Sequence, residues 1–270
     1  MNNPMFSIIT ITYNSEKTVE RTIKSVLAQT CKDYEYIIVD GASKDSTIDI
    51  VKKYEPLFEG RMKWKSEPDK GIYNAMNKGI ERSSGEIMGI VNSDDWIEPN
   101  ALSFISDIAN NCDNLNNSVF CASMMFHYEN GSELLYHANE NKFWIGAKRY
   151  SLNRGLFHPA MYVPKAVYER YGLFDERIFV SADIDFIFRC FDAGVNFIFK
   201  DVWVCHMTDG GASNKISLDI FKHDWSIFLS NRGKKGIEFY RLLYVRYFVL
   251  FIKKFTPLSF LKIYRKIKIS

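Results

Sequence analysis

The chain has few cysteines, and their arrangement excludes two kinds of small stabilised domain. Five cysteines occur among 270 residues, an odd number, and none forms a C-x-x-C pair or stands at zinc-finger spacing. We therefore expect free thiols rather than a disulfide framework or a structural zinc site, and free thiols favour the reducing cytoplasm. The start of the chain has no basic flank followed by an apolar segment, so we expect no signal peptide and no export.

Glycine-rich phosphate-binding motifs are also missing. A dinucleotide dehydrogenase carries G-x-G-x-x-G after its first strand, and a P-loop enzyme carries G-x-x-x-x-G-K-[ST]. At the equivalent place, residues 13–17 of this chain read YNSEK. Glycine amides are therefore not expected to cradle a phosphate, and a metal ion must neutralise any diphosphate that binds here.

Short β-rich runs alternate with helical periodicity over the first 112 residues. Strands are expected over residues 6–12, 34–40, 62–66 and 87–92, each followed by a helix. This alternation is typical of βαβ units, so we predict an α/β fold with a mostly parallel central sheet flanked by helices.

Beyond residue 112 the periodicity is weaker. We expect a strand over 119–126, a loop-rich stretch over 128–147, an extended segment over 157–163, a helix over 165–171 and a further helix near Asp183. The change of pattern predicts two halves of one domain, about 1–112 and about 113–231.

Positive charge is concentrated at the end of the chain. Residues 232–270 contain eleven Lys or Arg and one acid, a formal charge of +10, which leaves −7 for residues 1–231 of the total of +3. We expect a separate, helical basic tail over 232–270.

The basic tail is partly amphipathic. Residues 241–252 are apolar nearly all round, but they are too short and too charged to span a bilayer, which needs about 20 apolar residues. Residues 260–267 place Lys and Arg opposite aromatic and aliphatic side chains, which suits an anionic membrane surface. The alternative is a helix packed on the domain with its charges in solvent. Nucleic acid is not an expected partner, because the basic side lacks interleaved aromatic residues.

Acidic residues follow three of the predicted parallel strands. Asp40 ends the second strand, Asp69 follows the third, and Asp94 and Asp95 follow the fourth. Ligands of open α/β sheets bind outside the carboxyl ends of the strands, so these carboxylates are expected to converge on one crevice. Two adjacent carboxylates can bind a hard divalent cation, which would neutralise a diphosphate. For the pair taken alone, the alternative is a solvated turn before a helix.

Four motifs resemble family 2 of the inverting glycosyltransferases in order and spacing. They are ITITYN at 9–14, IVDGASKDST at 38–47, EPDKGIYNAMNKG at 67–79 and NSDD at 92–95. The resemblance covers about residues 5–100 and continues more loosely to about 215. It implies the GT-A fold, with a nucleotide-binding half over about 1–112 and an acceptor half over about 113–231.

The resemblance also implies roles for individual residues. Nucleotide-binding roles fall on Thr12, Asn14, Asp40, Asp69 and Asp94, with Asp40 on the base, usually uracil. Asp95, together with Asp94, would hold Mn²⁺ or Mg²⁺. Where the family often has an acid three residues before Asp95, this chain has Asn92, which leaves the set of metal ligands open.

Three further segments match the family beyond residue 150. Inverting transfer needs a base opposite the leaving group, and Asp183 resembles the family's catalytic base, although Ala182 stands where many members have Glu. The alternative is an acidic first turn that stabilises a helix dipole. His158 lies in a segment that resembles the acceptor side, with a structural histidine as the alternative. Trp203, His206 and residues 209–213 fall where the family has a flexible lid, and His206 is a weaker candidate metal ligand.

These inferences together predict an enzyme. We expect an inverting, metal-dependent transfer of one sugar from a nucleotide-sugar donor, a UDP-sugar, to a hydroxyl of a lipid-linked or growing glycan. The expected setting is bacterial surface polysaccharide assembly, such as O-antigen or capsule, at the cytoplasmic face of the inner membrane. Two alternatives stay open: a sugar nucleotidyltransferase, whose Gly- and Arg-rich entry loop is missing here, and a non-catalytic scaffold that binds nucleotide-sugars.

Overall fold

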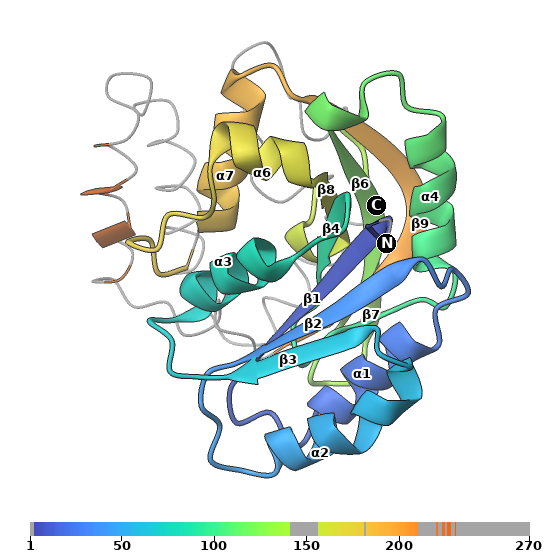
Figure 1. Cartoon of the computed structure of the whole chain (residues 1–270). Coiled ribbons are helices and arrows are strands. Elements are labelled where there is room, and N and C mark those ends of the chain that lie inside the picture. The colour runs from blue at the N-terminus through green and yellow to red at the C-terminus, as the bar shows by residue number, and fades with distance from the viewer. Residues whose placement is uncertain are drawn as a thin grey trace.

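The computed structural model describes residues 3–140, 156–180 and 182–209, together with residues 220, 223, 224, 226, 227 and 230 (Figure 1). The predicted basic tail at 232–270 and the glycines of the predicted lid, at 210 and 211, lie outside the described residues. No helix among the described residues is both long enough and apolar enough to cross a bilayer.

A single mixed sheet forms the centre of the described part of the chain. Its strands are β1 (Phe6–Thr12), β2 (Tyr34–Asp40), β3 (Met62–Ser66), β4 (Ile87–Ile90), β5 (Trp96–Ile97), β6 (Ser118–His127), β7 (Glu133–Tyr136), β8 (Met161–Pro164) and β9 (Asn196–Thr208). They lie in the order β3-β2-β1-β4-β8-β6-β9-β5, and β7 pairs with β6. The four strands β1 to β4 are mutually parallel, whereas β8 joins the second half by antiparallel pairing with β4 and β6.

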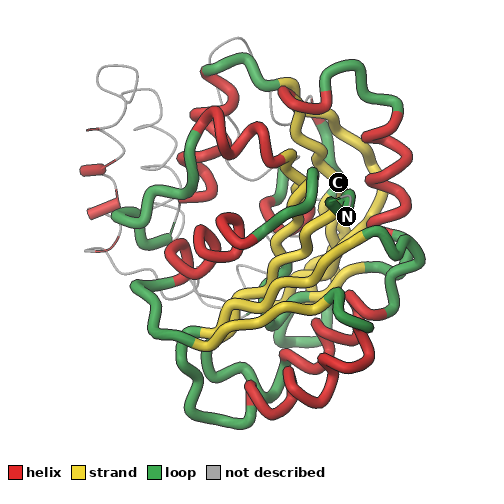
Figure 2. Tube along the Cα trace, in the orientation of Figure 1, coloured by secondary structure: helices red, strands yellow, loops and turns green. Residues whose placement is uncertain are grey.

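Helices cover both faces of the sheet, which confirms the predicted α/β class. They are α1 (Val19–Leu27), α2 (Thr47–Tyr54), α3 (Ile72–Arg82), α4 (Ala101–Asn110), α6 (Lys165–Tyr171) and α7 (Ala182–Asp192). Helices α3, α6 and α7 lie on one face, and α1, α2 and α4 lie on the other (Figures 1 and 2). The 3₁₀ turns η1 (Glu55–Phe58), η2 (Leu115–Asn117) and η3 (His158–Ala160) lie in the connections.

Two hydrophobic clusters, one on each face of the sheet, bury every residue of β1 and β2. In β1, Ile9 and Ile11 pack with α3, α6 and α7, while Phe6 and Ile8 pack with α1, α2 and α4. Successive strand residues point to opposite faces, so a strand covered on both sides needs apolar residues on both. Gly79 lets α3 approach β1 closely, because a Cβ at this position would collide with the side chain of Ile9.

Two predictions for the second half need correction. Residues 196–208 form β9, so Trp203 and His206 belong to a paired strand and not to a flexible lid. The β-branched and aromatic residues of this segment favour a strand, and pairing with β5 and β6 fixes it. The extended segment expected at 157–163 begins with η3, where Pro159 suits a helical first turn.

The stretch 128–147 was expected to be loop-rich. Residues 128–140 of it are described and include the short strand β7, whereas residues 141–147 lie outside the described residues.

Candidate functional site

A cavity of about 520 Å³ opens at the carboxyl ends of the parallel strands. It is lined by residues that follow β1, β3 and β4 and by residues of α3, η3, α7 and the end of β9. The volume lies in the range of small-molecule sites, roughly 300–1,000 Å³. Its position is the one where open α/β sheets bind ligands.

Most of the predicted site residues meet at this cavity. Those that line it are Thr12, Asp69, Asp94, Asp95, His158 and Asp183. Asn14 and Asp40 do not line it and instead support the loops beside it. Asp69, Asp94 and Asp95 therefore lie at one cavity at the carboxyl ends of the strands, whereas Asp40, expected in the same crevice, does not line it.

Asp95 is the most deeply buried carboxylate of the cavity, with 2% of its surface exposed. Its Oδ1 accepts the backbone N–H of Thr208 at 3.1 Å, and its Oδ2 accepts the side-chain amide of Asn92 at 3.2 Å. Burial, and then the neighbouring charge of Asp94, raise the pKa of Asp95 to about 7. A positive charge at this point would restore the ionised form.

Asp94 is held through its backbone, which leaves its carboxylate toward the cavity. Its carbonyl oxygen accepts the guanidinium of Arg21 at 2.6 Å and the hydroxyl of Thr208 at 3.1 Å. The Arg21 guanidinium lies 3.8 Å from the ring centroid of Trp96, which fixes its direction. Burial raises the pKa of Asp94, partly opposed by the charge of Arg21.

The oxygen atoms around Asp95 fit a hard divalent cation. The side-chain oxygen of Asn92 is buried and has no hydrogen-bond partner within the part of the chain that is described, so it adds a neutral oxygen beside two carboxylates. Among the same residues, no cluster of three or more His, Cys, Asp or Glu side chains is arranged for a metal ion. A cation held by one or two carboxylates and completed by substrate phosphates is the usual pattern for Mg²⁺.

Asp40 ties together the ends of three strands. Its carboxylate accepts the hydroxyl of Thr12 at 2.8 Å, the hydroxyl of Ser66 at 2.6 Å, and both the backbone N–H and the hydroxyl of Ser43. Burial alone would raise the pKa of Asp40, but these hydrogen bonds outweigh it and lower the pKa. Asp40 is therefore charged and shapes the loop beyond β2. Asn14, with φ of 50°, joins this loop by accepting the N–H of Lys44.

Asp69 lies directly over Gly41. A Cβ on Gly41 would stand 2.5 Å from Oδ2 of Asp69 and 3.3 Å from the ring of Tyr13. The other oxygen of Asp69 accepts the N–H of Gly71 at 2.8 Å. The absence of a side chain at position 41 thus lets the Asp69 carboxylate reach the cavity wall.

Asp183 lies in the first turn of α7 and is oriented by a tyrosine. The hydroxyl of Tyr73, on α3, donates to Oδ1 of Asp183 at 3.0 Å. Burial, and then the charge of Asp183, raise the pKa of Tyr73 well above its usual value, so the hydroxyl keeps its proton. The sequence alone indicated no role for Tyr73, because nothing in the motif that contains it points to a contact with Asp183, 110 residues away.

His158 begins η3 and faces the cavity as a neutral imidazole. Burial lowers its pKa, and the charge of Asp183 only partly opposes this shift. Its ring packs edge-on against Phe174, with centroids 5.7 Å apart. The side chain therefore offers a hydrogen-bonding group without a positive charge.

Both ring nitrogens of His206 lie within hydrogen-bond distance of other side chains. Its Nδ1 lies 2.7 Å from Nε2 of His127, and its Nε2 lies 2.6 Å from a carboxylate oxygen of Glu98. The ring also stacks on Trp96 at 4.4 Å between centroids. The residue stabilises the β5–β9 pairing behind the cavity.

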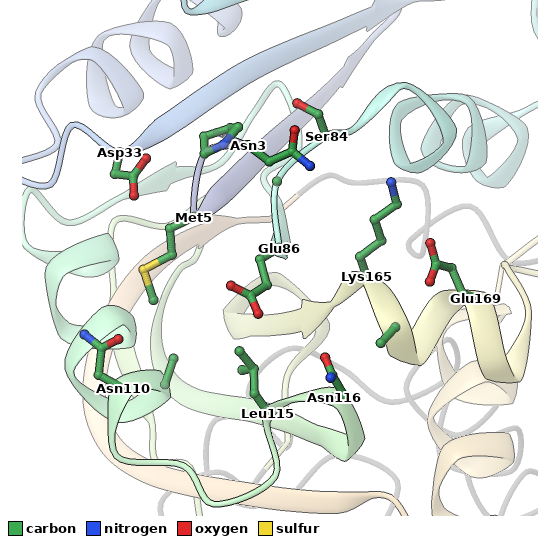
Figure 3. A pocket seen from close by; sticks show the side chains of 14 residues that line it. Asn3, Met5, Asp33, Ser84, Glu86, Asn110, Leu115, Asn116, Lys165 and Glu169 are labelled. Atoms are coloured by element: carbon green, nitrogen blue, oxygen red, sulfur yellow. The ribbon is translucent and has the colours of Figure 1, made fainter. Parts of the chain in front are cut away.

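A second cavity, of about 580 Å³, lies at the opposite end of the sheet (Figure 3). Met5, Asp33 and Glu86, which line it, stand next to the amino ends of β1, β2 and β4. None of the predicted site residues lines this cavity. The candidate chemistry is therefore confined to the carboxyl end of the sheet.

Comparison with known proteins identifies the class of enzyme. The sequence model described as glycosyl transferase family 2 matches residues 7–173, more than half of the chain. Over 226 residues the chain is 30% identical to the "PGL/p-HBAD biosynthesis glycosyltransferase" of Mycobacterium bovis (strain BCG / Pasteur 1173P2), covering 80% of this chain and 82% of that protein. The chain therefore belongs to glycosyl transferase family 2 and is a glycosyltransferase.

Solved structures of low sequence identity share its fold. S. aureus TarS 1–349 in complex with UDP-GlcNAc matches with a TM-score of 0.62 and 22% identity, covering 85% of this chain and 67% of that one. This chain spans 40% of the length of a longer TarS chain. The mannosyltransferase PcManGT from Pyrobaculum calidifontis, in complex with GDP-Man and Mn²⁺, matches with a TM-score of 0.63 and 16% identity, covering 91% and 70%. These likenesses confirm the predicted GT-A fold.

Proposed function

We propose that this family 2 glycosyltransferase transfers one sugar, with inversion, from a UDP-sugar to a hydroxyl of a lipid-linked or growing glycan. The observation that most supports this proposal is that Asp94, Asp95 and Asp183 line the same cavity. The cavity therefore offers carboxylates beside a diphosphate and a base for an acceptor hydroxyl.

The donor half of the cavity is assigned to the nucleotide. Thr12 and Asp69 line it directly, while Asp40 and Asn14 hold the loops after β1 and β2 in place. TarS was solved with UDP-GlcNAc and with UDP, which supports uridine as the nucleotide here. Asp94 would contact the ribose or the sugar.

Asp95 and Asp94 would hold Mn²⁺ or Mg²⁺, with the amide oxygen of Asn92 as a neutral neighbour. When bound, such an ion neutralises the charge that develops on the departing diphosphate. PcManGT was solved with Mn²⁺, which supports a divalent cation in this fold.

Asp183 would act as the general base. Tyr73 occupies Oδ1, and among the described residues no other side chain hydrogen-bonds to Asp183, so Oδ2 is available for the acceptor proton. As the proton moves to Oδ2, the acceptor oxygen attacks the anomeric carbon. The bond from that carbon to the diphosphate oxygen breaks, and its electron pair leaves with UDP. His158 would contact the acceptor.

The test compares two variants at the cavity with one remote control. Asp183→Asn is expected to abolish turnover of the UDP-sugar and to leave UDP binding with Mn²⁺ unchanged in calorimetry, whereas Asp95→Ala is expected to abolish both. Asp107→Asn, an exposed acid on α4, is the control and should resemble the wild type. Undiminished transfer by Asp183→Asn would contradict the assignment.

The same purified protein distinguishes the proposed transferase from a sugar nucleotidyltransferase and from a non-catalytic scaffold. A sugar nucleotidyltransferase would release pyrophosphate from a nucleoside triphosphate and a sugar phosphate. A non-catalytic scaffold would bind UDP and fail to hydrolyse any UDP-sugar in the presence of Mn²⁺. Slow hydrolysis of a UDP-sugar without acceptor, and no pyrophosphate, is the result expected for the proposed transferase.

The cellular setting is proposed from the basic tail. We place the enzyme on the cytoplasmic face of the inner membrane, in assembly of a bacterial surface polysaccharide such as O-antigen or capsule. The charge of +10 over residues 232–270 supports binding to anionic lipids. Removing these residues should release the protein from anionic vesicles at low salt, and continued sedimentation of the truncated protein would contradict the placement.

A further inference from the structure

Asp224 contacts two residues that line the cavity, Phe179 and Val180. Asp224 is buried, with 5% of its surface exposed. Its Oδ1 accepts the N–H of Phe179 at 2.7 Å, and its Oδ2 accepts the N–H of Val180 at 2.9 Å. Both carboxylate oxygens thus hold one point of the loop that leads into α7. Figure 1 shows this loop reaching from α6 toward the helical residues between 220 and 230.

Two neighbours of Asp224 strengthen the same contact. The ring of His223 stacks on the ring of Phe179, with centroids 4.5 Å apart and an interplanar angle of 18°. Ile227, one helical turn after Asp224, packs against the hydrophobic cluster that contains α6 and α7. Residues 223, 224 and 227 are helical, and this spacing places them on one side of a helix.

Phe179 presents an exposed part of its ring at the cavity. Its side chain is 50% exposed although one face is covered by His223, and both Phe179 and Val180 line the cavity. Asp183 follows only four residues later and also lines it. A large exposed aromatic residue beside a general base is a surface for an apolar group of the molecule that the base deprotonates.

The proximity of Phe179 and Val180 to Asp183 indicates which substrate they contact. All three residues line the same cavity. Because Asp183 is the proposed base for the acceptor hydroxyl, the substrate beside Phe179 and Val180 is the acceptor.

We infer that Asp224 holds residues 179–180 in place beside the acceptor and that the exposed ring of Phe179 stacks on the carbon-bound hydrogens of an acceptor sugar ring. This inference rests on the proposed function, because it needs Asp183 to act on an acceptor hydroxyl. Phe179 is then a specificity-determining residue, and Asp224 is a positioning residue that acts through the loop.

The experiment uses the full chain, the UDP-sugar that it hydrolyses fastest, and octyl glycosides of glucose, galactose and mannose as acceptor probes. UDP release is measured with and without each glycoside in the wild type, Phe179→Ala, Phe179→Trp and Asp224→Asn. Aromatic stacking predicts that Phe179→Ala raises the KM for the glycoside about 3- to 10-fold, while Phe179→Trp keeps it near the wild-type value. Loss of one charge-assisted hydrogen bond predicts a rise of about 10-fold for Asp224→Asn.

Hydrolysis of the UDP-sugar without glycoside and UDP binding serve as donor-side readouts. The remote control Asp107→Asn should leave both unchanged, and in Phe179→Ala the rise in the KM for the glycoside should exceed any change in either readout. An unchanged glycoside KM in Phe179→Ala, equal losses in the Ala and Trp variants, or no response of the wild type to any glycoside overturns the inference. Absence of both UDP binding and hydrolysis in the wild type instead refutes the proposed function.

Discussion

Replacing Glu35 by Gln is expected to remove a charge that stabilises the amino end of the sheet. The Glu35 carboxylate accepts the hydroxyl of Ser7 and the Lys63 ammonium, each at 2.7 Å, and also the N–H groups of Ser84 and Gly85. Burial alone would raise its pKa, but these donors outweigh burial and lower the pKa from 4.5 to about 2. At 1.36 kcal/mol per pKa unit, this lowering of the pKa corresponds to about 3 kcal/mol of stabilisation of the folded state. Because the Lys63 side chain is 59% exposed, solvent screens its charge, and we expect Glu35→Gln to lower the free energy of unfolding by about 2 kcal/mol.

The sign of the pH dependence follows from the lowered pKa. The stabilisation of the folded state by the Glu35 charge is complete above the unfolded-state pKa of 4.5 and is lost as the pH falls toward about 2. The free energies of unfolding of the wild type and Glu35→Gln, measured in urea from about pH 7 to about pH 3, should therefore converge on acidification. If the free energies of unfolding of the two proteins instead differed by the same amount at every pH, the stabilisation by Glu35 would not come from its charge.

Glu67→Gln is the matched control for this measurement. Hydrogen bonds from Lys65, Arg82 and Lys78 lower the pKa of Glu67 to about 2 as well, but its side chain is 25% exposed against 5% for Glu35. In about 1 M salt, where the Debye length is about 3 Å, the effect of Glu67→Gln should shrink and that of Glu35→Gln should persist. Equal salt sensitivity of the two variants would contradict the difference in burial.

Three further substitutions test other contacts. Tyr73→Phe keeps the ring and removes the hydrogen bond to Asp183, so kcat for UDP-sugar turnover should fall about 10-fold or more with UDP affinity unchanged in calorimetry; an unchanged kcat would show that the hydroxyl does not orient the base. Gly41→Ala places a methyl group 2.5 Å from Oδ2 of Asp69 and should weaken UDP binding several-fold without unfolding the protein, whereas wild-type affinity would mean that the carboxylate moves freely. Gly79→Ala should lower the free energy of unfolding, because overpacking against β1 costs about 1–3 kcal/mol and the better helix propensity of Ala returns only about 1 kcal/mol. Urea denaturation measures this difference, and a variant more stable than the wild type would contradict the close packing of α3 on β1.

The first half of the fold could be predicted because its local signals agree with its packing. The strands at 6–12, 34–40 and 62–66 have the predicted bounds, since a continuous apolar run or a run closed by turn residues marks each one. β9 was missed because four consecutive exposed residues, 200–203, interrupt its buried ones, and because its stability comes from pairing with β6, far away in the sequence. Strand pairing between distant segments produces no local periodicity in the sequence from which the strand could be predicted.

The site could be predicted to the extent that it depends on strand ends. Asp69, Asp94 and Asp95 were found because the carboxyl ends of parallel strands share one edge. The groups that orient the carboxylates were not found. Thr208 hydrogen-bonds to Asp95, 113 residues away in the sequence, and Tyr73 hydrogen-bonds to Asp183, 110 residues away. No local sequence motif marks contacts between residues so far apart.

The pairing of β5 with β9 makes the two halves of this enzyme inseparable. Trp96 and Ile97 come immediately after the carboxylate pair, yet their strand partners are His206 and Cys205. An excised amino-terminal fragment would lose the amide of Thr208 from Asp95 and leave a strand edge unsatisfied. Chimeric enzymes that exchange acceptor preference should therefore keep residues 196–208 with their own amino-terminal half and place the junctions on either side of that strand.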